Sequence, residues 1–239
     1  MELRILHLYD DVMNLYGEYA NVAVLARYWK DLGHEVSVDT LSLYEEKDIS
    51  GYDLYYMGAG TERKMKRMLP ELLKHGESLR RFCEEGRVLL FTGNACDVLG
   101  KTITDAEGRI YEGLKLGCFE TVEGKLRITG DCIAEFDGFE EPLVGFINKC
   151  SQNTGIETPL LTLKMGCGNE KGKKAEGFRK NNCLGTHLTG PMLVKNPAML
   201  RYVTRLVLGE KYDDTVSYPY MEQGYEVTKR ELLKRLEMK

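Results

Sequence analysis

The sequence lacks several features that would assign it to a functional class at once. Its 239 residues contain no apolar run close to the roughly 18 residues that span a membrane. Glu2 and Arg4 begin a strand-like pattern that is unlike a signal peptide. Basic residues are not in excess: the net charge is -4 and the pI about 5.7, whereas nucleic-acid binding requires clustered Lys and Arg. We therefore expect neither a membrane span nor a nucleic-acid partner.

Paired cysteine spacings are also missing. The seven cysteines are scattered, and none forms a CxxC motif. An odd, unpaired set favours reduced thiols and a cytoplasmic location over a disulfide framework. Cys150, Cys167 and Cys183 are 17 and 16 residues apart, which is unlike the paired spacing of a zinc site. No metal and no other cofactor is expected.

The composition supports a folded core, with 43% hydrophobic and 29% charged residues. Without repeats or a Pro/Ser-rich linker, residues 1–210 are expected to form a single domain. Residues 211–239 are then a C-terminal extension with an amphipathic helix over 225–239. That helix, which carries Leu232, Leu233 and Leu236, is expected to dock on its own domain, although it could also bind a partner.

Strands and helices alternate in the first hundred residues. Apolar runs predict strands at 3–8, 36–41, 54–57 and 88–91, the spacing of Val22, Leu25, Ala26 and Trp29 predicts a helix, and a long helix is expected over 62–85. This alternation indicates an α/β fold with an open, doubly wound, mostly parallel sheet. The second half is strand-rich, with strands expected at 117–122, 126–135, 142–148, 160–166 and 183–188 before a helix over 196–208.

Ligands of such sheets bind beyond the carboxyl ends of the strands, where residues 58–61 and 92–96 form two strand-to-helix turns. Small residues there expose backbone N–H groups that stabilise an anion or an oxyanion. The second turn is similar to a nucleophile elbow, yet its turn residue is Gly93 and not Cys or Ser. A glycine at such a turn can also be a simple steric requirement. Glu62 after the first turn is interpreted as part of a solvated first helical turn.

Six short segments, taken in order, carry a resemblance to a known family. They are MNLYG at 13–17, GAG at 58–60, LGK at 99–101, RITGD at 127–131, VGFIN at 144–148 and LGTHLTGP at 184–191. With this spacing the chain resembles class I glutamine amidotransferase-like domains of the cobyric acid synthase type. Among these it is most similar to the glutaminase subunits of lipid II isoglutaminyl synthases.

The resemblance implies a flavodoxin-like class I glutamine amidotransferase fold and an acyl-transfer reaction. In that family a cysteine attacks the amide of glutamine, a histidine moves the proton, and loop amides hold the oxyanion. The ammonia passes to a Mur-ligase-like synthetase subunit, which amidates a peptidoglycan precursor for the cell wall. The substrate-binding positions implied here are Gly58, Ala59, Gly60, Asn94 and Arg127.

The chain departs from the family at both catalytic positions. The family motif Cys-Gly-Gly-Tyr-Gln-x-Leu-Gly places the nucleophile at Gly93, and the family histidine falls at Thr189. Two substitutes are conceivable: Cys96, three residues beyond Gly93, and His187, two residues before Thr189. Both stand where the family has Tyr, and a free Cys on a first turn is usually a small packed hydrophobe.

Two functions therefore stay open. The chain is either a glutaminase subunit that supplies ammonia, or a catalytically silent homologue that binds a partner, glutamine or another small carboxylate. The sheet alone also leaves a flavodoxin-like flavin carrier as a weaker alternative.

Overall fold

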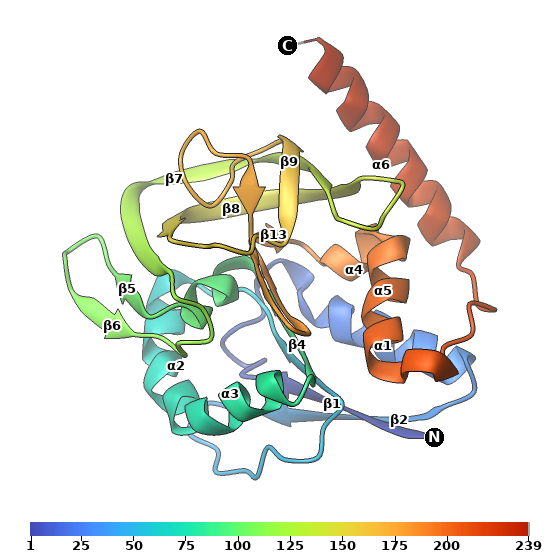
Figure 1. Cartoon of the computed structure of the whole chain (residues 1–239), viewed down its shortest axis with the longest axis horizontal. Coiled ribbons are helices and arrows are strands. Elements are labelled where there is room, and N and C mark those ends of the chain that lie inside the picture. The colour runs from blue at the N-terminus through green and yellow to red at the C-terminus, as the bar shows by residue number, and fades with distance from the viewer. Residues whose placement is uncertain (239) are drawn as a thin grey trace.

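Two β-sheets organise the chain in the computed structural model, which describes residues 1–238 (Figure 1). The first sheet has the strand order β11-β12-β4-β3-β1-β2. Its strands are β1 (Glu2–Leu8), β2 (Glu35–Leu41), β3 (Leu54–Met57), β4 (Val88–Thr92), β11 (Phe178–Lys180) and β12 (Cys183–Thr186). All neighbours pair in parallel except β11 with β12. The expected α/β fold with a mostly parallel sheet is confirmed.

Helices cover both faces of this sheet, which is why β3 and β4 are buried at every residue. Helix α1 (Tyr19–Asp31) packs its apolar stripe against one face, and the indole of Trp29 donates a hydrogen bond to Thr204 at 3.0 Å. Helices α2 (Glu62–Lys74) and α3 (Gly76–Glu84) pack on the other face.

The expected single helix over 62–85 is wrong in one respect, because it is two helices. Helix α2 ends at the cap residue His75, and α3 begins at Gly76. Glycine has low helix propensity, and a Cβ at Gly76 would lie 3.3 Å from Arg80. A single helical stripe cannot reveal such a break.

The second sheet is built around a long hairpin of β7 (Glu120–Glu135) and β8 (Leu143–Thr154). Its other strands are β5 (Thr102–Thr104), β6 (Ile110–Glu112), β9 (Leu161–Met165), β10 (Ala175–Glu176) and β13 (Leu188–Thr189). The two strands expected at 117–122 and 126–135 are one strand with an irregularity between Glu123 and Ile128. The strand expected at 183–188 is divided instead: β12 belongs to the first sheet and β13 to the second, with His187 between them.

The C-terminal segment consists of α4 (Met192–Lys195), α5 (Pro197–Leu208), a 3-10 turn (Gly209–Lys211) and α6 (Pro219–Glu237). Helix α6 begins six residues before the expected Tyr225. It buries Tyr225 and Leu232 against Ile133 and Val144 of the second sheet, so this helix does dock on its own domain. Its C-terminal end projects from the molecule in Figure 1. Nowhere in residues 1–238 is a helix long and apolar enough to cross a membrane.

Candidate functional site

The turn after β4 has the backbone geometry of a nucleophile elbow. Gly93 adopts a φ of +62°, in the left-handed region that favours glycine. The chain then continues as a 3-10 helix, Gly93–Leu99, whose seven residues are all buried. The sequence predicted a helix at this point, and the structure has the tighter 3-10 form.

The two positions that lack their family residues lie next to each other. A Cβ atom built on Gly93 would lie 3.3 Å from Cγ2 of Thr189, and only 2.5 Å from the Cβ of Ala59. Real side chains do not approach so closely. The two positions that the family motifs single out thus belong to one part of the structure, where the methyl group of Ala59 takes up the space beside Gly93.

The glycine loop after β3 is bonded to the elbow. The side-chain amide of Asn94 accepts a hydrogen bond from the N–H of Gly60 and donates one to its carbonyl oxygen, both at 2.9 Å. On its other side the loop packs closely on the segment after β1: a Cβ at Gly60 would lie 2.4 Å from Sδ of Met13. The Gly60 amide that was predicted to face an oxyanion is therefore occupied by Asn94.

A buried carboxylate beneath the elbow was missed by the sequence interpretation. Glu18 accepts hydrogen bonds from Thr92 at the end of β4, from Tyr56 of β3 at 2.6 Å and from the N–H of Gly190 at 2.7 Å. Burial raises the pKa of Glu18, and the hydrogen bonds from Thr92 and Tyr56 oppose that rise. Glu18 thus joins both central strands to the residue after Thr189.

His187 lies between two carboxylates. Its Nε2 is 2.9 Å from Asp97 Oδ1 and its Nδ1 is 3.0 Å from Glu176 Oε1, with all three side chains buried. Burial opposes the charge of each group, but their mutual attraction raises the pKa of His187 and lowers those of Asp97 and Glu176. This arrangement is a buried triad in which two carboxylates face the imidazole and favour its charged form.

Cys96 is not assembled with His187 as a thiol–imidazole pair, because both ring nitrogens are taken by carboxylates. Cys96 is fully buried, and its sulfur lies against the backbone of β12, 2.9 Å from the Cβ position of Gly185. Burial and the negative charges of Glu176 and Asp97 raise the thiol pKa well above its usual range. The geometry fits the interpretation of Cys96 as a packed hydrophobe.

Arg127, a predicted carboxylate-binding residue, is found at the surface of β7. Its guanidinium donates to Glu62 Oε1 at 2.5 Å and to Asn148 Oδ1 at 2.9 Å. Glu62 lies in the first turn of α2 as expected, with 24% of its side chain exposed, and its ion pair with Arg127 was not predicted. The two residues lie 65 positions apart, so only the fold reveals the contact.

The polar surroundings of the triad also escaped the sequence interpretation. Lys149, Ser151 and Asn153 alternate along β8, and each is buried. Asn153 donates to Asp97 Oδ1 at 2.8 Å. Polar residues at a period of two indicate a strand face that is solvated, but this face of β8 is covered by the 3-10 helix after Gly93. Alternation alone therefore does not reveal that this face is buried.

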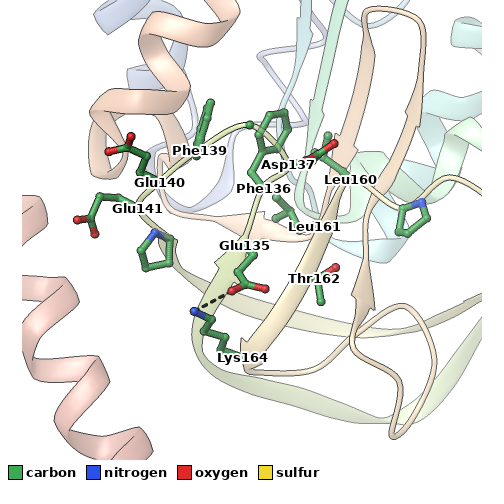
Figure 2. A pocket seen from close by; sticks show the side chains of 13 residues that line it. Glu135, Phe136, Asp137, Phe139, Glu140, Glu141, Leu160, Leu161, Thr162 and Lys164 are labelled. Atoms are coloured by element: carbon green, nitrogen blue, oxygen red, sulfur yellow. Dashed lines mark ion pairs between the residues drawn. The ribbon is translucent and has the colours of Figure 1, made fainter.

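A pocket of about 410 Å³ lies elsewhere, between the β7–β8 turn and β9. Figure 2 shows Glu135 and Lys164 pointing toward each other there, with their charged atoms 2.8 Å apart. The predicted site residues are absent from its lining, and the chemistry suggested by Gly93 and Thr189 does not extend to it.

Two solved structures of glutamine amidotransferases align with this chain. One, described as a glutamine amidotransferase, aligns with a TM-score of 0.59 and 16% identity over 84% of this chain and 98% of its own. Another, from Thermotoga maritima, aligns with a TM-score of 0.52 and 14% identity over 98% of this chain and 97% of its own. The fold is therefore that of class I glutamine amidotransferases.

Residues 4–197 match the CobB/CobQ-like glutamine amidotransferase domain, and the chain belongs to that family. Two relatives are lipid II isoglutaminyl synthase (glutamine-hydrolyzing) subunits GatD. The one from Staphylococcus aureus is 31% identical over 202 residues, which are 84% of this chain and 83% of the relative. The one from Streptococcus pneumoniae is 28% identical over 224 residues, 92% of this chain and 86% of the relative. The family resemblance inferred from the sequence motifs is confirmed.

Proposed function

We propose that this chain is a non-hydrolysing member of its family: a subunit that keeps the amidotransferase fold and binds a Mur-ligase-like synthetase, without itself releasing ammonia from glutamine. The observation that carries the proposal is the contact of Gly93 with Ala59. The position of the nucleophile has no side chain, and a Cβ atom there would lie 2.5 Å from another side chain.

The chemistry of glutamine hydrolysis gives the proposal its physical basis. Covalent acyl transfer needs a nucleophile, a base within hydrogen-bond reach and donors aimed at the oxyanion. Gly93 offers no nucleophile, and the hydroxyl of Thr189 is not a base near neutral pH. The N–H of Gly60 is already bonded to Asn94. All three requirements are compromised at once.

The partner is inferred from the relatives, which are named as subunits of a lipid II isoglutaminyl synthase and which this chain covers over 83% and 86% of their lengths. We infer that the chain works in the cytoplasm beside a synthetase that modifies a peptidoglycan precursor. Arg127, on the surface of β7, would then bind glutamine or another small carboxylate without turnover. Residues 211–239 lie beyond the matched family region, and we infer that they form an extension of a domain at 1–210.

Incubation of the purified full-length chain with L-glutamine, followed by measurement of glutamate and ammonia, tests the loss of activity. Intact mass after treatment with 6-diazo-5-oxo-L-norleucine reports a covalent adduct at a reactive thiol. We expect neither product nor adduct, whereas the S. aureus relative serves as the positive control. Hydrolysis that disappears in Cys96→Ala would refute the proposal and identify a relocated nucleophile.

The partner is tested separately by co-expression with the Mur-ligase-like protein of the same organism and by size-exclusion chromatography. A stable complex that amidates its substrate with free ammonium but not with glutamine is the expected result. Glutamine-dependent amidation by the complex would show that the partner completes the site, and the silent assignment would then be wrong.

A further inference from the structure

A pocket of about 600 Å³ lies where the C-terminal helix meets the rest of the chain. Val24 of α1 and Val194 of α4 line one side, and side chains between positions 218 and 228, in the first half of α6, line the other. Helix α6 packs beside α4 and α5 (Figure 1). The matched family domain ends at residue 197, so that domain alone does not build this pocket.

The walls of the pocket are mostly apolar and aromatic. Val194 and Tyr220 keep 36% and 89% of their surface exposed. The hydroxyl of Tyr218 donates to a carboxylate of α1 at 2.7 Å, and that of Tyr225 donates to a backbone carbonyl of the β7–β8 turn at 2.6 Å, so neither hydroxyl is free. A pocket of this size with apolar walls and few polar groups is typical of a site for a small molecule.

Lys195 is the one charged residue among those that line the pocket. It is half-buried, and its ammonium group forms no ion pair or hydrogen bond with residues 1–238. The Nζ atom lies 3.5 Å from the Cβ position of Gly190. Burial lowers the pKa of Lys195, and the charges of Glu18 and Asp131 oppose that change from beyond ion-pair distance. A cation that is partly removed from water without a partner is unfavourable, and a bound anion would relieve this cost.

We propose that this pocket binds one small apolar anion, an aromatic or aliphatic molecule with a single carboxylate or sulfonate group, whose charged end contacts Lys195. The single cation sets the sign of the ligand's charge, because the other lining residues are uncharged. The apolar walls disfavour a strongly hydrated inorganic anion and favour a hydrophobic body. This inference goes beyond the proposed function and does not depend on whether the chain hydrolyses glutamine.

The test is a fluorescence titration of the full-length chain with two probes. One is 8-anilinonaphthalene-1-sulfonate, an aromatic sulfonate, and the other is N-phenyl-1-naphthylamine, the same ring system without the sulfonate. We expect the wild type to bind one sulfonate probe saturably. Lys195→Met keeps an unbranched side chain and removes the charge, so the Kd for the sulfonate should rise about tenfold while the Kd for the neutral amine stays as in wild type. Lys195→Arg keeps the charge and should retain sulfonate binding.

Gly224→Leu tests the location of the bound probe. No atom lies within 4 Å of a Cβ built on Gly224, so a leucine there extends into the open space of the pocket, and it also has the higher helix propensity. The affinity for both probes should fall at least about tenfold. Val227→Leu is the matched control, because Val227 is an exposed residue of α6 outside the lining, and both affinities should stay as in wild type.

Urea denaturation establishes that each variant is folded, since partly folded proteins also bind the sulfonate probe. If Lys195→Met does not fold, Gly224→Leu and its control still decide the question. Absence of saturable binding by wild type overturns the proposal, as does sulfonate affinity equal to wild type in folded Lys195→Met or Gly224→Leu. Loss of probe binding as the chain dimerises, followed by size-exclusion chromatography, would assign the pocket to a second copy and overturn it as well.

Discussion

Gly93 and Ala59 share a space that holds only one side-chain carbon: a Cβ on Gly93 would lie 2.5 Å from the Cβ of Ala59. The position that the family motif assigns to the nucleophile therefore lacks both a side chain and the space for one. The glycine loop lies against the elbow, and Asn94 holds it there through two hydrogen bonds to Gly60.

Introducing the family cysteine at position 93 as the only change should destabilise the protein. Gly93→Cys introduces a side chain at a φ of +62° and against Ala59, so we expect a loss of about 2–4 kcal/mol in the free energy of unfolding from overpacking and backbone strain. Ala59→Gly removes the opposing methyl group, and the double variant should recover at least about 1 kcal/mol of that loss. Urea denaturation of the two single variants and the double variant measures this coupling.

Additive losses in the Gly93/Ala59 cycle would show that the two residues do not compete for one space. In the double variant, alkylation of the new thiol by iodoacetamide reports whether the elbow has become accessible. We still expect no glutaminase activity, because Thr189 supplies no base.

Hydrophobic periodicity correctly predicted the helices and strands that pack against apolar neighbours. The stripe on α1 and the continuous apolar runs of β3 and β4 were predicted because their surroundings are apolar and uniform. The family motifs located Gly93 and Thr189, and the structure brings these two residues together.

Such patterns could not predict the buried polar side chains around His187. His187 finds one partner 90 residues away and the other 11 residues away, and neither separation has a periodic signature. Lys149, Ser151 and Asn153 alternate like a solvated strand, because alternation shows that one face differs from the other and not which face is covered. Pairing of distant charges depends on topology, which the sequence specifies only through the complete fold.

The Asp97–His187–Glu176 triad should contribute strongly to the free energy of unfolding. His187→Leu leaves two buried carboxylates without the imidazole between them, and we expect a loss of about 3–5 kcal/mol in the free energy of unfolding at pH 7. His34→Leu, at a half-buried position outside the triad, is the control and should cost less than about 1 kcal/mol. If His187→Leu does not fold, Asp97→Asn should show a smaller loss of the same origin; stability equal to wild type in either variant contradicts the ion-pair assignment.

The triad also predicts an alkaline limit to stability. The pKa of His187 is raised in the folded state by Asp97 and Glu176 despite burial, so its contribution is complete below the unfolded value near 6.5 and is lost as the pH rises through the folded pKa. Unfolding free energies of wild type should therefore decline between neutral and alkaline pH more steeply than those of a folded His187 variant. Parallel curves for the two proteins would mean that His187 is neutral in the native state.

His7 should make the protein less stable as the pH falls below neutral, which is the opposite of the effect expected for His187. It is 4% exposed, packs edge-on against Tyr56 with ring centroids 5.1 Å apart, and its Nε2 lacks a hydrogen-bond partner among residues 1–238. Burial lowers the pKa of His7 from 6.5 to about 4. Between these two pH values His7 is protonated in the unfolded chain and neutral in the folded chain. Stability from this residue is complete above pH 6.5 and falls by about 3 kcal/mol as the pH drops to 4.

His7→Phe keeps the aromatic contact and has no titrating group at this position. Its unfolding free energy should match wild type within about 1 kcal/mol at pH 7 and exceed that of wild type increasingly between pH 6 and 4. The buried carboxylates titrate in both proteins, so the difference between the two unfolding free energies, measured by urea denaturation at each pH, isolates His7. A difference that stays constant with pH would rule out burial of His7 in its neutral form.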